Sequence, residues 1–291
     1  MNHGCRPPLP PDVMQKLREK HDGKSANMQD ICSTTNKTSL TEIFADLSTF
    51  CMFIGFPRSG HSLVAALLDA HSNIVIAHEV HALKKIYEGF SETQIYSELV
   101  ENSIARAKNG RGTKRYSYTV ADQWQGKFHK LRVIGDKQGG GTTSFLAKHS
   151  DALHRLKETI ALKVKFICVL RNPFDNISTI AARSNLTLEQ SSHRYFSLCS
   201  LIEEIKRQIS TDDLIDLTHE SFIQDPVRGL KGLCDFLEEP VTEDYLIACG
   251  SIVYKSPHKS RNDFEWSQKL IAATENRIAE FAFLNGYSFE N

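Results

Sequence analysis

Short apolar runs alternate with longer stretches of helical spacing along most of the chain. The runs are rich in β-branched or aromatic residues and lie at 50–54, 73–77, 131–134, 165–170 and 213–217. Such runs are typical of strands buried in a sheet. Apolar residues recur at helical spacing over about 63–68, 91–107, 188–209 and 267–284. Because strands that alternate with helices pair in parallel, the pattern predicts an α/β fold, a single αβα domain with a central, mainly parallel sheet.

Residues 1–45 do not share this pattern. They are mostly polar and contain two Pro-Pro pairs around Leu9. A segment of this kind does not bury enough apolar surface to form a core of its own. We therefore predict a polar N-terminal extension over 1–45 and a folded domain over 46–291.

The overall charge gives no sign of a polyanionic partner. Lys and Arg together number 35, as do Asp and Glu, so the formal net charge is zero and we expect no nucleic acid partner. Basic residues are nevertheless in excess over 101–140. This local excess fits either a solvated surface or a funnel for an anionic ligand.

Cysteine usage and hydropathy favour a cytoplasmic location. The 7 cysteines have no C-x-x-C spacing, and Cys51 and Cys168 lie inside apolar runs, as expected of reduced, buried thiols. No stretch approaches the 18 or so apolar residues of a membrane span. We therefore expect no membrane association.

A candidate phosphate-binding loop follows the apolar run at 50–54. Residues 55–62 read Gly-Phe-Pro-Arg-Ser-Gly-His-Ser and lead into a helix. Glycines let the backbone approach a ligand closely, and the free N–H groups of a helix start favour an anion. The spacing matches the nucleotide P-loop except that His61 stands in place of the lysine, and the cation is Arg58 instead. The alternative is an ordinary strand-to-helix turn.

A second candidate lies where the run at 165–170 ends. Residues 171–179 read Arg-Asn-Pro-Phe-Asp-Asn-Ile-Ser-Thr, which places a guanidinium and two hydroxyls at the carboxyl edge of the sheet. Ligands of α/β proteins bind at this edge, and a guanidinium suits a phosphate. The alternative is that Arg171 forms a structural ion pair with Asp175.

In this order, the two motifs resemble those of sulfotransferases that use 3′-phosphoadenosine 5′-phosphosulfate (PAPS), most closely the carbohydrate and bacterial small-molecule type. Residues 57–62 resemble the 5′-phosphosulfate loop, from which His61 departs, and residues 171–179 resemble the 3′-phosphate motif, whose serine falls at Thr179. The resemblance covers about 50–287 and implies a P-loop NTPase-like sulfotransferase fold, with 3′-phosphoadenosine 5′-phosphate (PAP) as product. It implies that the donor is bound by Arg58, Ser59, Gly60, His61, Ser62, Arg171 and either Ser178 or Thr179.

The same resemblance implies roles for three further segments. A Glu-x-His stretch supplies the base in related carbohydrate sulfotransferases, which makes Glu79 the candidate, with His78 and His81 as alternates. Lys137, after the run at 131–134, is expected near the sulfonate or the acceptor, although a solvated lysine before a pliable glycine loop (139–141) is the alternative. Basic residues of a late loop are expected to contact the phosphates of the donor, namely Lys259 and Arg261.

These assignments predict transfer of a sulfonate to a hydroxyl or amine of a small-molecule acceptor, either a natural product or a carbohydrate. The acceptor attacks in line while a base removes its proton, and arginine and lysine offset the charge on the leaving group, so no metal is expected. The basic segment 109–130 is expected to shape the acceptor pocket. The alternatives are an ATP-dependent P-loop kinase, against which His61 argues, and a non-catalytic nucleotide-binding protein.

Overall fold

The computed structural model describes residues 40, 42–112 and 116–291. The extension predicted over 1–45 lies outside the described residues, except for 40 and 42–45. Among the described residues, no helix has the length and apolar character needed to cross a bilayer.

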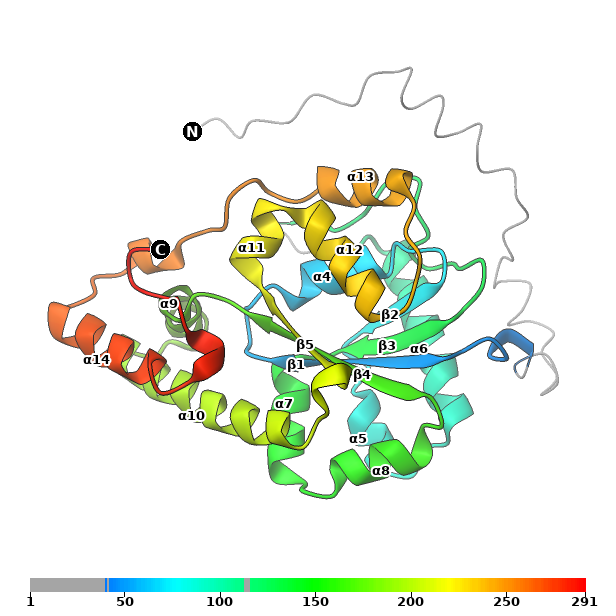
Figure 1. Ribbon diagram of the computed structural model, residues 1–291, viewed down its shortest axis with the longest axis horizontal. Coiled ribbons are helices and arrows are strands. Elements are labelled where there is room, and N and C mark those ends of the chain that lie inside the picture. Colours follow the sequence, from blue (N-terminus) through cyan, green and yellow to red (C-terminus); the bar gives the residue numbers. More distant parts are fainter. Residues whose placement is uncertain (1–39, 41, 113–115) are drawn as a thin grey trace, which may run out of the picture.

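The centre of the protein is a five-stranded sheet in the order β2-β3-β1-β4-β5 (Figure 1). Every pairing in it is parallel, which confirms the prediction of a parallel sheet. The strands are β1 (Thr49–Gly55), β2 (Ile74–His78), β3 (Val133–Lys137), β4 (Lys163–Leu170) and β5 (Leu214–Thr218).

Helices cover both faces of the sheet, as expected of an αβα domain (Figure 1). One face carries α4 (His61–Leu68), α11 (His219–Gln224), α12 (Pro226–Phe236) and α13 (Glu243–Ser251). The other packs against α5 (Ala82–Tyr87), α6 (Glu92–Lys108), α7 (Gly140–Lys148), α8 (Ala152–Thr159), α9 (Pro173–Ser184), α10 (Leu188–Arg207) and α14 (Gln268–Ile278). Short 3₁₀ turns complete the chain at η1 (Thr211–Asp213), η2 (Ser260–Asp263) and η3 (Ala282–Leu284).

Burial on both faces explains why the sequence of strand β1 is apolar throughout. Phe50, Met52 and Ile54 point into the core shared with α5–α10, whereas Cys51 and Phe53 point into the core under α4 and α12. All five side chains are fully buried. A parallel strand covered by helices on both faces has no solvent side, so its sequence does not alternate between apolar and polar residues.

Two segments bear on the sequence-based expectations. Strand β3 continues from the apolar run at 131–134 and ends at Lys137, where the lysine is buried, so the alternative of a solvated loop lysine is wrong. The pliable glycine loop expected at 139–141 is wrong, because α7 begins at Gly140. A Cβ on Gly140 would lie 2.9 Å from Cδ of Pro57, so the missing side chain lets this helix start against the loop that follows β1.

We predict that Gly135→Ala destabilises the fold, because a Cβ at this position in β3 would lie 2.2 Å from the Cys51 carbonyl oxygen on β1. Overpacking of this kind is expected to lower the free energy of unfolding by about 1–3 kcal/mol or more. The matched control is Gly232→Ala on the exposed side of α12, where an added Cβ meets nothing within 4 Å. Alanine favours a helix over glycine by about 0.5–1 kcal/mol, so urea unfolding should show a gain there. Similar losses for both variants would contradict the packing argument.

Candidate active site

The carboxyl ends of the parallel strands bring the candidate residues into one row. Strand order places Glu79 after β2, Lys137 at the end of β3, residues 56–60 after β1, Arg171 after β4 and His219 after β5. Residues that are distant in sequence therefore lie side by side at one edge, which is where α/β folds bind ligands.

The loop between β1 and α4 has the backbone shape of an anion cradle. Gly55, Arg58 and Gly60 have φ angles of 126°, 69° and 99°, so the chain turns sharply before the helix begins at His61. A Cβ on Gly60 would lie 2.3 Å from Nδ1 of His219, so only glycine fits there. The first N–H groups of α4 lack intrahelical acceptors and can bind an anion, beside the exposed side chain of Arg58.

Two buried side chains from other helices hold this loop in place. The Ser59 hydroxyl accepts a hydrogen bond of 2.8 Å from Nδ2 of Asn176 in α9. The Thr143 hydroxyl of α7 accepts from the Gly55 N–H at 2.9 Å and donates to the Gly55 carbonyl at 3.1 Å. Sequence analysis missed both Asn176 and Thr143, because their partners lie far away along the chain.

The side chain of His61 packs beneath the loop. Its Nε2 donates to the Ile54 carbonyl at 2.9 Å, and the residue is 6% exposed. Burial lowers the pKa of His61 to about 4, so the ring is neutral near pH 7. The imidazole ring is therefore hydrogen-bonded to the end of β1 and does not take the place of a P-loop lysine. His61 can contribute its backbone N–H to the start of α4.

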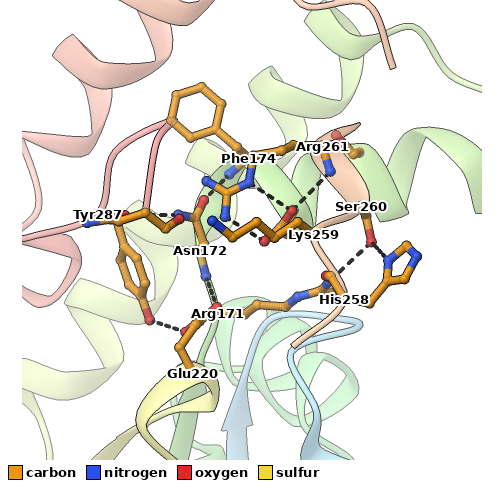
Figure 2. A network of polar contacts seen from close by, with 12 residues as sticks. Arg171, Asn172, Phe174, Glu220, His258, Lys259, Ser260, Arg261 and Tyr287 are labelled. Carbon is orange, nitrogen blue, oxygen red and sulfur yellow. Dashed lines mark hydrogen bonds and ion pairs between the residues drawn. The ribbon is translucent and has the colours of Figure 1, made fainter. Parts of the chain in front are cut away.

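Arg171 joins three segments of the site (Figure 2). Its Nη1 donates to the Arg58 carbonyl at 3.2 Å and to Oγ1 of Thr179 at 3.3 Å. Its Nη2 donates to the His258 carbonyl at 2.6 Å and to Oγ of Ser260 at 3.1 Å. The buried Nε has no acceptor among the described residues. Arg171 thus connects the phosphate loop, α9 and the segment before η2, and it retains a donor for a ligand.

The structure distinguishes the two hydroxyls that the sequence leaves open. Thr179 lies against Arg171 and donates to the Asp175 carbonyl at 2.8 Å. Ser178 is fully buried, and its Oγ accepts from Nε1 of Trp266 at 3.2 Å. Thr179 therefore shares the site of Arg171, whereas Ser178 belongs to the packing around Trp266.

Arg261 is part of a buried ion pair with Asp175, so the alternative pairing of Asp175 with Arg171 is not formed. Two bonds join the guanidinium to the carboxylate, Nε–Oδ1 at 3.1 Å and Nη2–Oδ2 at 2.9 Å. The third nitrogen donates to the carbonyls of Ser288 and Phe289. Arg261 is 2% exposed, and its guanidinium nitrogens bind protein oxygens. It therefore supports the site as a structural residue rather than facing a phosphate.

Residues near the C-terminal end of the sequence close this side of the site (Figure 2). The Asn172 N–H donates to Glu220 at 2.8 Å, and the Glu220 carboxylate also accepts from the Tyr287 hydroxyl at 2.9 Å. Asn172 Nδ2 donates to the Ser288 carbonyl at 2.9 Å. Lys259, the other basic residue of the late loop, is exposed and donates to the Glu290 carbonyl at 3.2 Å.

At the other end of the row, Glu79 and Lys137 form an ion pair. Nζ of Lys137 lies 2.8 Å from Oε1 of Glu79. The lysine is 3% exposed, whereas half of the glutamate side chain is open to solvent. Burial raises the pKa of Glu79, but the hydrogen bond and charge of Lys137 outweigh it, so the pKa is lowered overall. Glu79 is therefore an ionised carboxylate with one oxygen held by lysine and one side facing solvent.

The turn that carries Glu79 is strained and is held by a buried carboxylate. Glu79 and His81 both have left-handed backbone, with φ of 60° and 62°. The Asp136 carboxylate accepts hydrogen bonds from the N–H groups of Val80 at 3.1 Å and Ala82 at 2.9 Å. Left-handed non-glycine residues persist where their surroundings fix them, and they gather at functional sites. Asp136 therefore fixes the position of the Glu79 carboxylate.

The two neighbouring histidines differ in environment. Nε2 of His78 lies 3.9 Å from Oε1 of Glu79. Burial, followed by the charges of Lys137, Arg106 and Arg111, lowers the pKa of His78 to about 4, so it is neutral near pH 7. His81 is exposed where α5 begins. In the described part of the chain, no three His, Cys, Asp or Glu side chains are grouped so as to hold a metal ion.

Comparison with known proteins gives a family match and several solved structures of low sequence identity. A family model with the description "Sulfotransferase family" matches residues 52–244. No curated protein sequence matches the chain. The sulfotransferase domain of the Synechococcus olefin synthase is 15% identical, with 81% of this chain and 95% of that chain covered and a TM-score of 0.49.

Two other solved structures show a similar degree of likeness. The sulfotransferase domain from the curacin biosynthetic pathway is 16% identical and has a TM-score of 0.49, with 80% of this chain and 97% of that chain covered. A mouse sulfotransferase complexed with PAP is 14% identical and has a TM-score of 0.46, with 84% of this chain and 87% of that chain covered.

We predict that Arg261→Gln strongly destabilises the fold, because it leaves the Asp175 carboxylate buried without its guanidinium. Breaking a buried pair on one side typically lowers the free energy of unfolding by about 3–5 kcal/mol. The matched control is Arg207→Gln, which removes a 63% exposed arginine that pairs with Glu203 and Glu204. Exposed pairs contribute about 1 kcal/mol or less. If urea unfolding showed equal losses for both variants, the assignment of Arg261 to a structural pair would be wrong.

Proposed function

The chain belongs to the sulfotransferase family, whose donor is PAPS, and we propose that it transfers the sulfonate of PAPS to a hydroxyl or amine of a small molecule. A natural product or a carbohydrate is the proposed acceptor. The observation that carries this proposal is the row at the carboxyl edge of the sheet, with Glu79 at one end, the loop 56–60 in the middle and Arg171 beyond it.

The donor is proposed to lie over β1 and β4. Arg58 and the backbone N–H groups of Ser59, Gly60, His61 and Ser62 would hold the 5′-phosphosulfate. Arg171 and Thr179 would hold the 3′-phosphate, which is supported by the free Nε of Arg171 and by its contact with Thr179. A guanidinium and the N–H groups of a helix start are the donors that suit these anionic groups.

The acceptor is proposed to lie on the β2 side of the loop. The ionised Glu79 carboxylate would accept the proton of the attacking hydroxyl or amine as the bond to sulfur forms. Strand β3, which ends at Lys137, lies between β2 and β1, and this order supports a base and a donor loop on opposite sides of Lys137. The acceptor would then attack sulfur in line with the leaving oxygen. Lys137 and Arg58 would offset the negative charge on the leaving phosphate, with the lysine also orienting the base.

The proposal also includes the cellular location of the protein and the bounds of its catalytic domain. Five cysteines are buried free thiols, Cys51, Cys168, Cys199, Cys234 and Cys249, which supports the cytoplasm as the proposed location. We also propose that the catalytic domain spans 46–291, since the described elements from β1 to η3 pack on the same sheet.

We predict that Thr179→Val weakens PAP binding about tenfold, because it removes a hydroxyl next to Arg171 and a charge-assisted hydrogen bond is worth about 1.5–3 kcal/mol. The matched control is Ser178→Ala, one residue earlier, which should leave PAP affinity within about twofold. Isothermal titration calorimetry with PAP measures both. A greater loss of PAP affinity for Ser178→Ala than for Thr179→Val would show that the assignment of the 3′-phosphate to Thr179 is wrong. Binding of ATP in preference to PAP would favour a kinase.

We predict that Glu79→Gln keeps PAP binding but lowers turnover by about 10²–10⁴-fold, the usual contribution of a general base. Turnover is measured with radiolabelled PAPS and a panel of alcohols, sugars and amines. His81→Gln is the matched control and should retain turnover, because the His81 side chain is exposed, whereas that of His78 is partly buried and 3.9 Å from Glu79. Full activity of Glu79→Gln with loss in His78→Gln would move the base to His78, and PAP binding without turnover in the wild type would favour a non-catalytic protein.

A further inference from the structure

A small pocket lies between α4, the end of β2 and the segment that follows α6. Its polar lining comes from Ser62, His78, Arg106, Arg111 and Tyr118, and alanines of α4 and β2 form its apolar wall. Among the described residues, no carboxylate lines the pocket. The pocket is small, with space for about one water-sized group, such as one oxygen atom of a larger ligand, and the two charged side chains named in its lining are both arginines.

Arg111 is fixed in this pocket by a buried partner. It is 5% exposed and forms an ion pair with Asp69, and its Nη2 also donates to the Ser103 hydroxyl at 2.8 Å. Asp69 is itself fixed, because it accepts from the Ile76 N–H at 2.8 Å and from the Ser103 hydroxyl. The buried Nε of Arg111 nevertheless has no acceptor among the described residues. The pair with Asp69 thus explains the position of Arg111 but leaves one donor unused.

Arg106 has no such structural explanation. Its Nε is also buried without an acceptor, and no carboxylate within the described residues pairs with it. Asn102, one turn earlier on α6, accepts from the His78 N–H at 2.8 Å, so this face of the helix is fixed against the end of β2. Leaving a buried charged donor unsatisfied is costly, so a positive group placed in this way requires a ligand or solvent. Arg106 is therefore available to an anion.

The pocket lies between the two halves of the proposed reaction centre. Ser62 belongs to the first turn of α4, next to the proposed phosphosulfate cradle. His78 precedes the proposed base Glu79, and the two side chains are 3.9 Å apart. A molecule that presents a nucleophile to Glu79 would therefore be able to place one oxygen atom of a neighbouring group in this pocket.

We propose that Arg106 and Arg111 bind an anionic oxygen group of the acceptor, so that the substrate is a small alcohol or amine that also carries a carboxylate, phosphate or sulfate. This inference rests on the proposed function in one respect, namely that the molecule bound in the pocket is the acceptor. The anion-binding pocket itself rests on the arginines, their unused Nε donors and a described lining that includes no carboxylate. Two guanidinium groups suit an oxyanion because each presents several N–H donors in one plane.

The first test is an anion titration of the full-length protein saturated with PAP, so that the donor site is occupied. Phosphate, sulfate and acetate are added separately at constant ionic strength, and the ring signal of His78 is followed by NMR after assignment with His78→Gln. We expect a saturable shift, with affinity lowered about tenfold or more in Arg106→Gln. The matched control is Arg228→Gln on α12, an exposed arginine that does not line the pocket, which should bind as the wild type does.

The choice of anion identifies the chemistry of the acceptor. Tighter binding of acetate would indicate a carboxylate, and tighter binding of phosphate or sulfate would indicate the corresponding ester. A second readout compares sulfonate transfer to hexoses, hexuronates and hexose phosphates. We expect the acid-bearing sugars to have higher kcat/KM, with this preference lost in Arg106→Gln.

Failure of this inference and failure of the proposed function give different results. The absence of a saturable shift, or equal anion affinity in Arg106→Gln and the wild type, would overturn the anion pocket even if PAP binds and sulfonate is transferred. Absence of PAP binding would overturn the donor assignment. In that case the same titration without PAP still tests the pocket, because the His78 signal and its dependence on Arg106 report this location and not the loop 56–60.

Discussion

Parallel pairing of the five strands is the constraint on which the rest of the structure depends. Because every strand runs the same way, the loops after β2, β3, β1, β4 and β5 all emerge at one edge. A single antiparallel strand would send its loop to the opposite edge and divide the candidate residues. The sheet therefore fixes both the proximity of Glu79, Lys137 and Arg171 and their order, and the order separates the side proposed for the base from the side proposed for the nucleotide.

Buried polar side chains then convert this edge into defined geometry. Asp136 fixes the turn of Glu79, Thr143 and Asn176 hold the loop after β1, and Glu220 holds the start of α9. Each of these groups would be costly to bury without its partner, so each bond selects one conformation of an otherwise irregular segment. Arg58 and Glu79 are exposed to solvent, whereas Arg171 and Lys137 are buried. The two buried cations therefore combine structural support with the ligand contacts proposed for them.

The sequence was sufficient to predict the five strands, several helices and two motifs, but not α7 and not most side-chain partnerships. Strands buried on both faces leave continuous apolar runs, and glycines before a helix leave a recognisable loop. Asp175 and Arg261 carry no such signal, because only the folded chain brings η2 against α9. The glycines at 139–141 read as a loop since nothing local shows that Pro57 lies against them. Arg106 and Arg111 belong to a basic stretch that fits either a solvated surface or a funnel for an anionic ligand, and the sequence does not show which side chains face them.

The hydrogen bonds of Arg171 have a consequence for ligand exchange. Its two terminal nitrogens bind four protein oxygens, two of which belong to the segment His258–Ser260. A phosphate that used these nitrogens would have to replace some of those acceptors, so the measured affinity would be a difference between two sets of bonds. The segment released in this way would gain freedom when the nucleotide enters and would be recaptured when it leaves. Its amide hydrogen exchange would then be linked thermodynamically to nucleotide occupancy.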